Sequence, residues 1–579
     1  MVILFLAFPR SGGMRMDLNL VVAGEAGQGL QTLYEIMSKA LFRQGYSIFG
    51  SKDYMSRIRG GHNFMQIRVS DKEINSPAEE VDLLIALSEE GKQHHAGRVK
   101  ESGVILLEEN GKIRSDAQVV SLPAESMAEK INPRAVNTVF LGAAWKLLGF
   151  SLGELRQVIK ERFTDPDIQS DNLKLLEKGH EEVSFSYSGP PPPEREEERL
   201  LLDGNQAVAL GAAVSDVQFY SAYPMTPSTG ILNFLASHQE ELGIAVEQAE
   251  DEIAAINMAL GASYAGVRAM TGTSGGGFSL MVEGFGLAGV MEAPIVIAEV
   301  QRPGPATGMP TRTEQGDLSF VINSHQGEFP LKVIAPRTQE EAFYQTVRAF
   351  NLAEKYQIPV VILSDQFLAD SKTDMKEIEL EELSIRRNIL DENSWPEDRD
   401  YKRYEITESG ISPRAYPGQM KDDIVLQDSH EHDEYGFIEE GAEKRKRMVE
   451  KRMRKLTMIN RKESAEPVYY GPSQPEYLMA GWGSTYGPMR EARRMLADED
   501  ISIGMLSFCD VWPLPTAELE KNRTYSTTLA TVENNATGQL ASLISAESGL
   551  TIDHRVLKYN GRPFTAGEIY RRIKREVIA

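Results

Sequence analysis

The sequence predicts an α/β protein built from three domains. Its 579 residues exceed what a single hydrophobic core holds, and this length is typical of about three to four domains. Short apolar strands alternate with helical stretches in three regions, and a proline-rich segment separates the first region from the second. Because strands that are joined by helices pair in parallel, we expect mostly parallel sheets covered by helices.

The first domain is predicted over residues 17–188. Residues 19–23 (NLVVA) have the pattern of a buried strand, a glycine-rich turn follows, and residues 30–42 have the pattern of a helix. This order indicates an α/β unit. The further elements expected here are strands at 65–69, 83–86 and 104–107 and an apolar helix at 138–148.

Residues 1–16 precede this pattern. They include a short apolar run at 2–8 with no basic residue before it. A signal peptide needs a positively charged start, and a membrane span needs about 20 apolar residues. We therefore expect a disordered tail or a misassigned start codon rather than a targeting segment, and we expect residues 1–15 to be dispensable.

A linker and a second α/β domain follow. The linker is predicted at residues 189–199, where four successive prolines precede a glutamate-rich run. Prolines cannot join a helix or a central strand, and they favour an extended spacer. The second domain is predicted over 200–375, with a helix at 206–214 and strands at 218–221, 267–271, 295–300, 332–334 and 359–363.

The segment 376–470 is polar and irregular, and it contains the basic stretch EKRKRMVEKRMRKL at 443–456. We interpret this stretch as a solvated connecting helix whose thin apolar side holds Met448, Met453 and Leu456; an arm that binds nucleic acid is the alternative. The third α/β domain is predicted over 471–579, with strands near 476–481, 501–507 and 528–533.

Charge and cysteine content exclude several classes of function. The chain has 62 Lys and Arg against 85 Asp and Glu, a net charge of −23, which argues against a general affinity for nucleic acids or anionic membranes. Cys509 is the single cysteine, so the chain cannot form an internal disulfide, a four-cysteine zinc site or its own iron–sulfur cluster. A reducing, cytoplasmic location is expected.

Two glycine-flanked motifs lie in the first domain. GEAGQG (24–29) reverses the spacing of the dinucleotide fingerprint GxGxxG, and no acidic residue follows in the ribose-binding position. A nucleotide site and a close-packed turn at an interface are both open. In RIRGGHNF (57–64), Arg57 and Arg59 point to the same side, which suits an anion or an acidic interface.

Candidate ligand-binding residues follow the strands of the second domain. YPMTPSTG (223–230) holds Thr226 between two prolines at the end of a strand, where α/β folds bind ligands; an ordinary loop is the alternative. Glu250 and Glu252 precede a helix of small residues, where acids commonly complement the helix dipole. TGTSGGG (271–277) lacks bulky side chains, so a ligand or a second chain can approach the backbone at Gly275 and Gly276.

Arg302 and Arg312 lie on glycine- and proline-rich loops after the strand at 295–300. Such placement suits bidentate recognition of carboxylates, and surface salt bridges are the alternative. We predict no metal site at HEHD (430–433), because neighbouring side chains there alternate in direction. The sequence contains no GxxxxGK[ST] motif, which excludes P-loop phosphoryl chemistry.

Taken together, these motifs resemble the alpha subunit of the 2-oxoacid:ferredoxin oxidoreductases, in the form with a gamma domain fused ahead of it. The resemblance covers residues 17–579. YPMTPS is similar to the family's YPITPS, with Met225 in place of isoleucine, and GEAGQG with RGGHNF resembles the gamma domain. EDEIAAINMALGASYAGVRAMTGTSGGGFSLM and GMPTRTEQGDL resemble the domain that binds the pyrimidine of thiamine diphosphate. The resemblance implies a pyrimidine-binding-type parallel sheet in the central domain and a transketolase C-terminal-like last domain.

The resemblance also implies a reaction. The family carries out CoA-dependent oxidative decarboxylation of a 2-oxoacid to an acyl-CoA and CO2, with reduction of ferredoxin. Thiamine diphosphate is then shared with a beta subunit, which carries Mg²⁺ and a 4Fe–4S cluster. This chain lacks a GDG motif, so Glu533-Asn534-Asn535 stands without it, and it has a single cysteine. Both absences match a chain whose beta subunit carries the diphosphate site and the cluster. 2-Oxoglutarate is the expected substrate; pyruvate, a branched-chain 2-oxoacid or a non-catalytic scaffold role are the alternatives.

Residue roles carry over from the family by position. Thr226 matches the signature threonine close to the reacting 2-oxoacid. Glu252, with Glu250 as the alternative, matches the glutamate that contacts the aminopyrimidine ring, and Gly275 and Gly276 are expected to bind the cofactor. Arg302 and Arg312 correspond to arginines near the substrate carboxylate, and Arg312 suits the far carboxylate of a dicarboxylic substrate.

Overall fold

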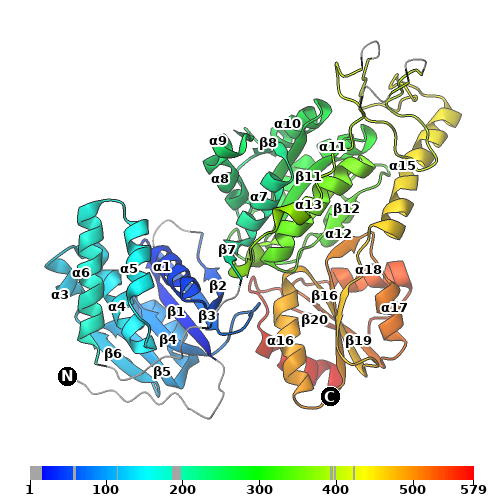
Figure 1. Cartoon of the computed structure of the whole chain (residues 1–579). Helices are drawn as coiled ribbons and strands as arrows, with labels where there is room; N and C mark the ends of the chain where they lie inside the picture. Colours follow the sequence, from blue (N-terminus) through cyan, green and yellow to red (C-terminus); the bar gives the residue numbers. More distant parts are fainter. Residues whose placement is uncertain are drawn as a thin grey trace. The chain divides into compact units, whose positions relative to one another are not determined.

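The computed structural model describes residues 16–56, 60–111, 113, 115–184, 193, 197–391, 395–396, 399–420 and 424–579. These residues form two compact units (Figure 1). The first comprises the chain up to Leu202 together with Ser371–Glu377, and the second comprises Asp203–Asp370 and Ile378–Ala579. Residues 1–15, for which we expect a disordered tail, and the linker prolines 190–192 lie outside the described residues.

The first unit is built on an eight-stranded mixed sheet in the order β6-β5-β4-β1-β3-β2-β14-β7. β1, β4, β5 and β6 pair in parallel, whereas β3, β2 and β14 pair antiparallel. The strands span Asp17–Ala26 (β1), Ser47–Asp53 (β2), Gly60–Ser70 (β3), Val81–Ala86 (β4), Val99–Glu108 (β5), Gln118–Leu122 (β6), Arg199–Asp203 (β7) and Lys372–Lys376 (β14). The sheet is therefore mixed, whereas the sequence predicts a mostly parallel sheet.

Helices pack against this sheet through one large apolar cluster. The main ones are α1 (Leu30–Arg43), α4 (Val136–Leu148), α5 (Gly153–Arg162) and α6 (Pro166–Glu182), which Figure 1 shows side by side. The shorter α2 (Glu89–His95) and α3 (Ala124–Glu129) complete the unit. Trp145, in the last turn of α4, is fully buried in the cluster.

Strand β14 corrects the predicted domain boundary at 375. Residues 372–376 pair with β2 and so belong to the first sheet, not to the central domain. Asp374 explains the placement, because its carboxylate accepts from the Ile48 amide (2.7 Å) and from Arg199 Nε (2.8 Å). The segment pairs with residues more than 300 positions away in sequence, and no local pattern marks such a contact.

The second unit contains a seven-stranded sheet in the order β18-β12-β13-β11-β10-β8-β9. All of its strands are parallel except the edge strand β18 (Asp510–Trp512), which comes from the C-terminal region. The others are β8 (Val217–Ala222), β9 (Ala245–Gln248), β10 (Arg268–Thr273), β11 (Ile295–Gln301), β12 (Lys332–Ile334) and β13 (Pro359–Asp365).

Helices connect these strands and cover the sheet (Figure 1). They are α7 (Gly204–Val214), α8 (Thr229–Ser237), α9 (Gln239–Leu242), α10 (Glu252–Tyr264), α11 (Gly275–Val290), α12 (Leu318–Asn323), α13 (Gln339–Tyr356) and α14 (Gln366–Asp370). α7 begins with a capping box, in which Asp203 accepts from the Gln206 amide (2.9 Å) and Gln206 accepts from the Asp203 amide (3.1 Å).

The C-terminal sheet has five strands in the order β15-β17-β16-β19-β20, and only β15 is antiparallel. The strands span Val468–Tyr470 (β15), Tyr477–Trp482 (β16), Ile503–Phe508 (β17), Thr528–Glu533 (β19) and His554–Leu557 (β20). The helices are α16 (Tyr486–Ala497), α17 (Ala517–Arg523), α18 (Gln539–Ser548) and α19 (Ala566–Ile573). One apolar cluster joins this sheet to the central one, with Trp482 and Phe508 packed in the same core as Phe278 and Val321.

The basic helix α15 (Ala442–Lys462) is not the solvated helix that the sequence predicts. Its buried face is cationic as well as apolar and includes Met448, Lys451 and Lys455, whereas Met453 and Leu456 are only partly buried. Lys451 Nζ lies 2.5 Å from Glu292 Oε1, and Lys455 pairs with the other oxygen of the same carboxylate. A buried acid therefore explains the basic residues, which sequence patterning alone assigns to solvent.

Candidate active site

The candidate site residues of the central domain lie at the carboxyl ends of β8, β10 and β11. Loops after these three parallel strands carry Thr226, the glycines of 275–277, and Arg302. The carboxyl edge of a parallel sheet is where α/β folds bind ligands, because loops there converge from neighbouring strands. β8 and β11 are the two hydrogen-bonded neighbours of β10, so these loops start side by side (Figure 1).

The loop that carries Thr226 is held from three sides. Asn205 Nδ2 on α7 donates to the Pro227 carbonyl (2.9 Å), and Ser228 Oγ donates to the Met225 carbonyl (2.8 Å). Arg302 donates to the carbonyl of Thr226 itself (2.7 Å). The Thr226 side chain is half-buried, and no hydrogen bond to its hydroxyl occurs within the described residues. The hydroxyl is thus fixed in position with its hydrogen-bonding capacity unused.

Glu252 is the first residue of α10, which Asp251 caps by accepting from the Ala254 amide (2.7 Å). The Glu252 side chain is only 3% exposed, and its Oε1 atom is buried without a hydrogen-bond partner. A buried polar atom without a partner is unfavourable, so this carboxyl group points to a ligand that completes it. Glu250, the alternative, is exposed. Of the two glutamates, only Glu252 has a buried side-chain oxygen without a partner among the described residues.

The glycines at the start of α11 let acidic side chains approach the helix closely. A Cβ atom on Gly277 would lie 2.6 Å from Glu252 Oε1, and one on Gly275 would lie 2.5 Å from Asp317 Oδ2. A Cβ atom on Gly276, by contrast, would have the Ala306 carbonyl oxygen, 3.6 Å away, as its nearest neighbour. From the sequence we expect a ligand or a second chain to approach this backbone. In the structure, the side chains of Asp317 and Glu252 approach it at Gly275 and Gly277.

Arg302 lies among acids. Its Nε atom is buried without a hydrogen-bond partner, and Asp317, Glu252 and Glu299 are close enough to act on its charge. Burial lowers the pKa of Arg302, and the three acids oppose that effect. A guanidinium with an unused N–H in a buried setting suits the recognition of a carboxylate.

Arg312 lies further along the same loop and is buried, with 7% of its surface exposed. The loop is fixed between the two sheets of the second unit, since Gln315 donates to the Trp482 carbonyl (2.9 Å) and its own amide donates to the Asn534 carbonyl (2.7 Å). Gly561 of the C-terminal domain also approaches, because a Cβ atom there would lie 3.3 Å from Arg312 Cβ. The C-terminal domain thereby helps to position Arg312.

Sequence reasoning missed two acids near Arg302, the buried Glu299 and the half-buried Asp317. Glu299 is fully buried in β11, and Asp317 immediately precedes α12. Glu299 is the one charged residue in the strand IVIAEVQ, and that is a signal the sequence offers. A single acid in an otherwise apolar central strand is rare unless it is paired or functional.

Comparison with known proteins adds to this geometry. The family model described as the thiamine diphosphate-binding part of pyruvate flavodoxin/ferredoxin oxidoreductases matches residues 211–451, and the model of pyruvate ferredoxin/flavodoxin oxidoreductase matches residues 19–182. A 2-oxoacid:ferredoxin oxidoreductase alpha subunit of Sulfolobus sp is 34% identical over 616 residues, covering 96% of each chain. This chain belongs to the 2-oxoacid:ferredoxin oxidoreductase alpha subunits.

Other members of the family extend the match. The subunit KorA of 2-oxoglutarate oxidoreductase from Mycobacterium tuberculosis is 27% identical, covering 96% of this chain and 91% of that one. The solved 2-oxoglutarate:ferredoxin oxidoreductase of Magnetococcus marinus, with 2-oxoglutarate, coenzyme A and succinyl-CoA bound, is 31% identical, with a TM-score of 0.90 over 97% of this chain and 99% of that chain. The predicted family and α/β fold class are confirmed, and the chain is a subunit of an oxidoreductase that acts with other subunits.

Other motifs of this alpha subunit have structural roles. In the turn GEAGQG, Gln28 Oε1 accepts from the Glu25 amide (2.7 Å) and fills the space beside Gly24, which favours the close-packed turn over a nucleotide site. Arg57 and Arg59 lie outside the described residues. Glu533 accepts from the amides of Leu540 (2.7 Å) and Ala541 (3.0 Å), so it fixes the start of α18.

Two of the described histidines lie in contact with each other. His62 and His95 are 3.0 Å apart at their Nε2 atoms, but nowhere in the described chain do three His, Cys, Asp or Glu side chains gather as metal ligands. In HEHD, Glu431 binds Arg452 and His432 packs on Tyr404. Among the described helices, none is long and apolar enough to cross a membrane.

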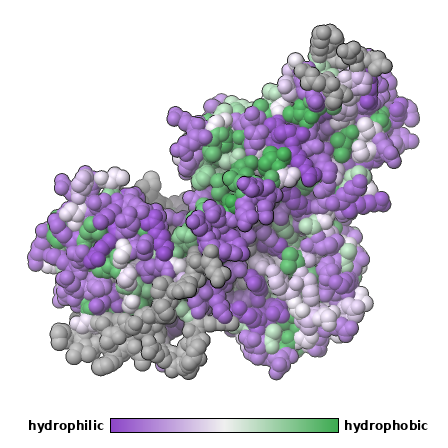
Figure 2. Space-filling view, viewed as in Figure 1, coloured by the Kyte–Doolittle hydropathy of each residue, from purple (hydrophilic) through white to green (hydrophobic). Residues whose placement is uncertain are grey.

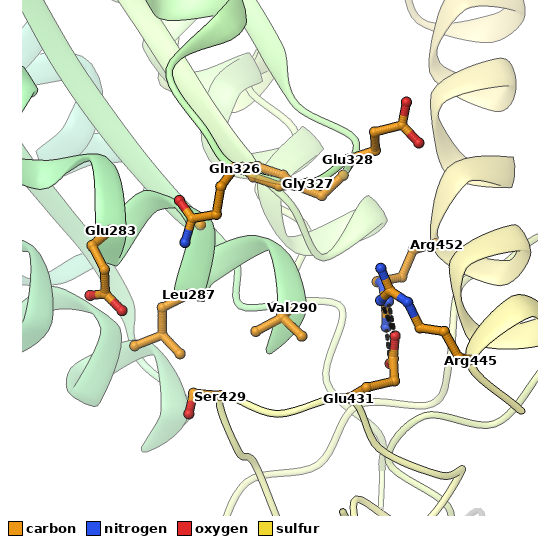
Figure 3. A pocket seen from close by; sticks show the side chains of 12 residues that line it. Glu283, Leu287, Val290, Gln326, Gly327, Glu328, Ser429, Glu431, Arg445 and Arg452 are labelled. Atoms are coloured by element: carbon orange, nitrogen blue, oxygen red, sulfur yellow. Dashed lines mark hydrogen bonds and ion pairs between the residues drawn. The ribbon is translucent and has the colours of Figure 1, made fainter. Parts of the chain in front are cut away.

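A pocket of about 230 Å³ lies at the C-terminal half of α11, away from the glycines that begin that helix (Figure 3). Leu287 and Val290 line one side, and Glu431 lines the other, paired with Arg445 and Arg452 (Figure 3). None of the predicted site residues lines this pocket. Its two arginines are already paired with Glu431, so they are not free to recognise a ligand carboxylate.

Proposed function

We propose that this chain is the alpha subunit of a 2-oxoglutarate:ferredoxin oxidoreductase. The enzyme would convert 2-oxoglutarate, CoA and two oxidised ferredoxins to succinyl-CoA, CO2, two reduced ferredoxins and a proton. The observation that carries the proposal is the buried carboxyl group of Glu252, with one oxygen unpartnered, beside Arg302, which also binds the Thr226 carbonyl. It occurs in a chain that is similar over 97% of its length to an enzyme whose structure holds 2-oxoglutarate and coenzyme A.

The residues of the central domain fit the aminopyrimidine half of thiamine diphosphate. Glu252 offers a buried carboxyl group that lacks a partner, at the N-terminus of a helix, and such a group can hold or move a proton at a ring nitrogen. Gly276 leaves open space next to the start of α11. When bound, thiamine diphosphate supplies a nucleophilic carbon and an electron sink for the decarboxylation.

The other residues would handle the substrate. Arg302 would pair with the 1-carboxylate through its unused N–H, and the Thr226 hydroxyl would donate a hydrogen bond close to the reacting carbonyl. Arg312 would pair with the distal carboxylate, and a buried cation discriminates strongly between substrates with and without that group. Binding at two points would orient 2-oxoglutarate for reaction.

A second subunit would complete the site. The chain has no GDG motif for Mg²⁺ and diphosphate, and its one cysteine cannot hold a 4Fe–4S cluster, so both would come from a beta subunit. Exposed apolar side chains flank the site, with Ile253 50% exposed in the first turn of α10 and Leu280 51% exposed in the second turn of α11. Figure 2 shows apolar residues gathered over this central domain. Such patches are typical of protein interfaces.

Co-expression with the cognate beta subunit tests the proposal. We expect CoA-dependent reduction of methyl viologen, with the highest kcat/KM for 2-oxoglutarate within a panel that includes pyruvate and branched-chain 2-oxoacids. The chain alone should give no reduction, because half of the site is missing. A preference for pyruvate would refute the substrate, and failure of every 2-oxoacid with a loaded, assembled enzyme would favour a non-catalytic scaffold.

A further inference from the structure

We infer that Glu299 and Asp317 share a single proton, and that this pair sets the negative charge that faces Arg302. The burial of the two carboxyl groups and their contact carry the proton-sharing pair; its effect on substrate binding rests on the function proposed above. Both acids would be positioning residues, because they act through Arg302 and do not contact the substrate.

Three of the four carboxyl oxygens of the pair are buried without a hydrogen-bond donor among the described residues, although Asp317 as a whole is half-buried. Glu299 is 0% exposed, and both of its side-chain oxygens, as well as Asp317 Oδ2, receive no hydrogen bond from any N–H or O–H group of the described residues. The two side chains are within hydrogen-bonding contact of each other. Ionised carboxylates only accept hydrogen bonds, so contact between these two requires a proton on one of them.

Electrostatics gives the same answer. Two ionised carboxylates in contact and out of water repel each other strongly, as in other carboxyl dyads that hold one proton between them. Burial raises the pKa of Glu299 well above its usual range, and the neighbouring Asp317 and Asp365 raise it further. Burial also raises the pKa of Asp317, to about 6, against the opposing effects of Glu299 and Arg302. At neutral pH these shifts favour one proton on the pair, and the deeper burial of Glu299, against the half-buried Asp317, favours Glu299 as the residue that holds it.

The charged groups around the pair are Asp365 at the end of β13, Glu314 on the loop before Asp317, Arg302 after β11 and, acting on Arg302, Glu252 on α10. Asp365 differs from the pair because hydrogen-bond donors already stabilise its carboxylate. Its Oδ1 accepts from the Leu368 amide (3.0 Å) and from Thr313 Oγ1 (3.2 Å). Among these neighbours Arg302 is the cation. It thus faces one negative charge from the pair instead of two.

Whether the Glu299–Asp317 pair holds its proton affects how strongly Arg302 attracts a 2-oxoacid. With one negative charge behind it, Arg302 is held in place and keeps attraction for the substrate carboxylate. When the pair loses its proton at high pH, the second negative charge competes with the substrate for the same guanidinium. The KM for the 2-oxoacid should therefore rise with pH, while kcat changes little.

Infrared difference spectroscopy of the full chain tests the shared proton without any need for activity. Glutamine at position 299 keeps a donor for Asp317, so Glu299→Gln should fold and should remove one protonated-carboxyl C=O band at pH 7. Asp317→Asn should shift that band without removing it, because the proton stays on Glu299 while its acceptor changes. The exposed Glu283 serves as a control, and Glu283→Gln should change only bands of ionised carboxylate.

The inference is wrong if Glu299→Gln removes only bands of an ionised carboxylate, or if Asp317→Asn leaves the protonated-carboxyl band unshifted. Kinetics of the assembled enzyme tests the consequence. In Glu299→Gln, kcat/KM near neutral pH should stay within about threefold of wild type, and the rise of KM at high pH should disappear. An unchanged pH profile would overturn the role toward Arg302. If the infrared result holds but no 2-oxoacid is turned over, only the proposed function fails.

Discussion

Replacing Glu252 with glutamine is expected to lower turnover of the assembled enzyme by about 10²–10⁴-fold, the usual cost of losing a positioned proton-transfer group. Glutamine has the size of glutamate but cannot hold or release the proton. The side chain is buried with one oxygen unpartnered, so the change removes no hydrogen bond at that oxygen within the described chain. Hydrogen–deuterium exchange at C2 of added thiamine diphosphate should fall by the same order, while assembly with the beta subunit persists.

Glu250→Gln is the matched control, since Glu250 is two residues away but exposed. We expect a mild effect on both exchange and turnover. If Glu250→Gln abolishes exchange and Glu252→Gln does not, the wrong glutamate has been assigned. If neither change matters, this domain does not activate thiamine.

Replacing Arg312 with alanine is expected to change substrate preference. Loss of one partner of a buried charge pair costs about 2 kcal/mol or more, so kcat/KM for 2-oxoglutarate should fall by at least about 30-fold. Pyruvate lacks the distal carboxylate, and its kcat/KM should change little. The ratio of the two values in one enzyme preparation is the measurement, because it cancels any loss of folded protein.

Arg312→Lys separates charge from shape in the same assay. Lysine keeps the charge but not the planar fork of donors, so we expect an intermediate loss for 2-oxoglutarate. Equal losses on both substrates in Arg312→Ala would assign Arg312 to the fixed loop between the two sheets, or to the carboxylate that both substrates share.

Much of the fold could be predicted from local patterns. Strands at 332–334 and 528–533 match β12 and β19, and the helix predicted at 30–42 is α1, because apolar runs bounded by turns mark buried elements. β14 and β18 could not be predicted, since each is a short strand fixed by a partner strand far away in sequence. The burial of Lys451 and Lys455 likewise depends on Glu292, which lies 159 and 163 positions away.

The candidate site residues also fall into those marked by a local sequence pattern and those that depend on distant contacts. Glu252, Thr226 and Arg302 could be found because each sits in a motif beside a strand end or a helix start. Glu299 carries only a weak local signal, and its importance depends on contact with Asp317, which the chain brings in from a separate loop. Which acid holds a proton is a property of packing, and no spacing in the sequence encodes it.

The central claim is that this chain supplies half of a thiamine diphosphate site. Calorimetric titration of thiamine diphosphate with Mg²⁺ against the purified chain, alone and then with the beta subunit, tests it most directly. We expect weak binding to the chain alone and tight binding to the pair of subunits, with the tight binding weakened by Glu252→Gln. Sub-micromolar binding to the chain alone would contradict the claim.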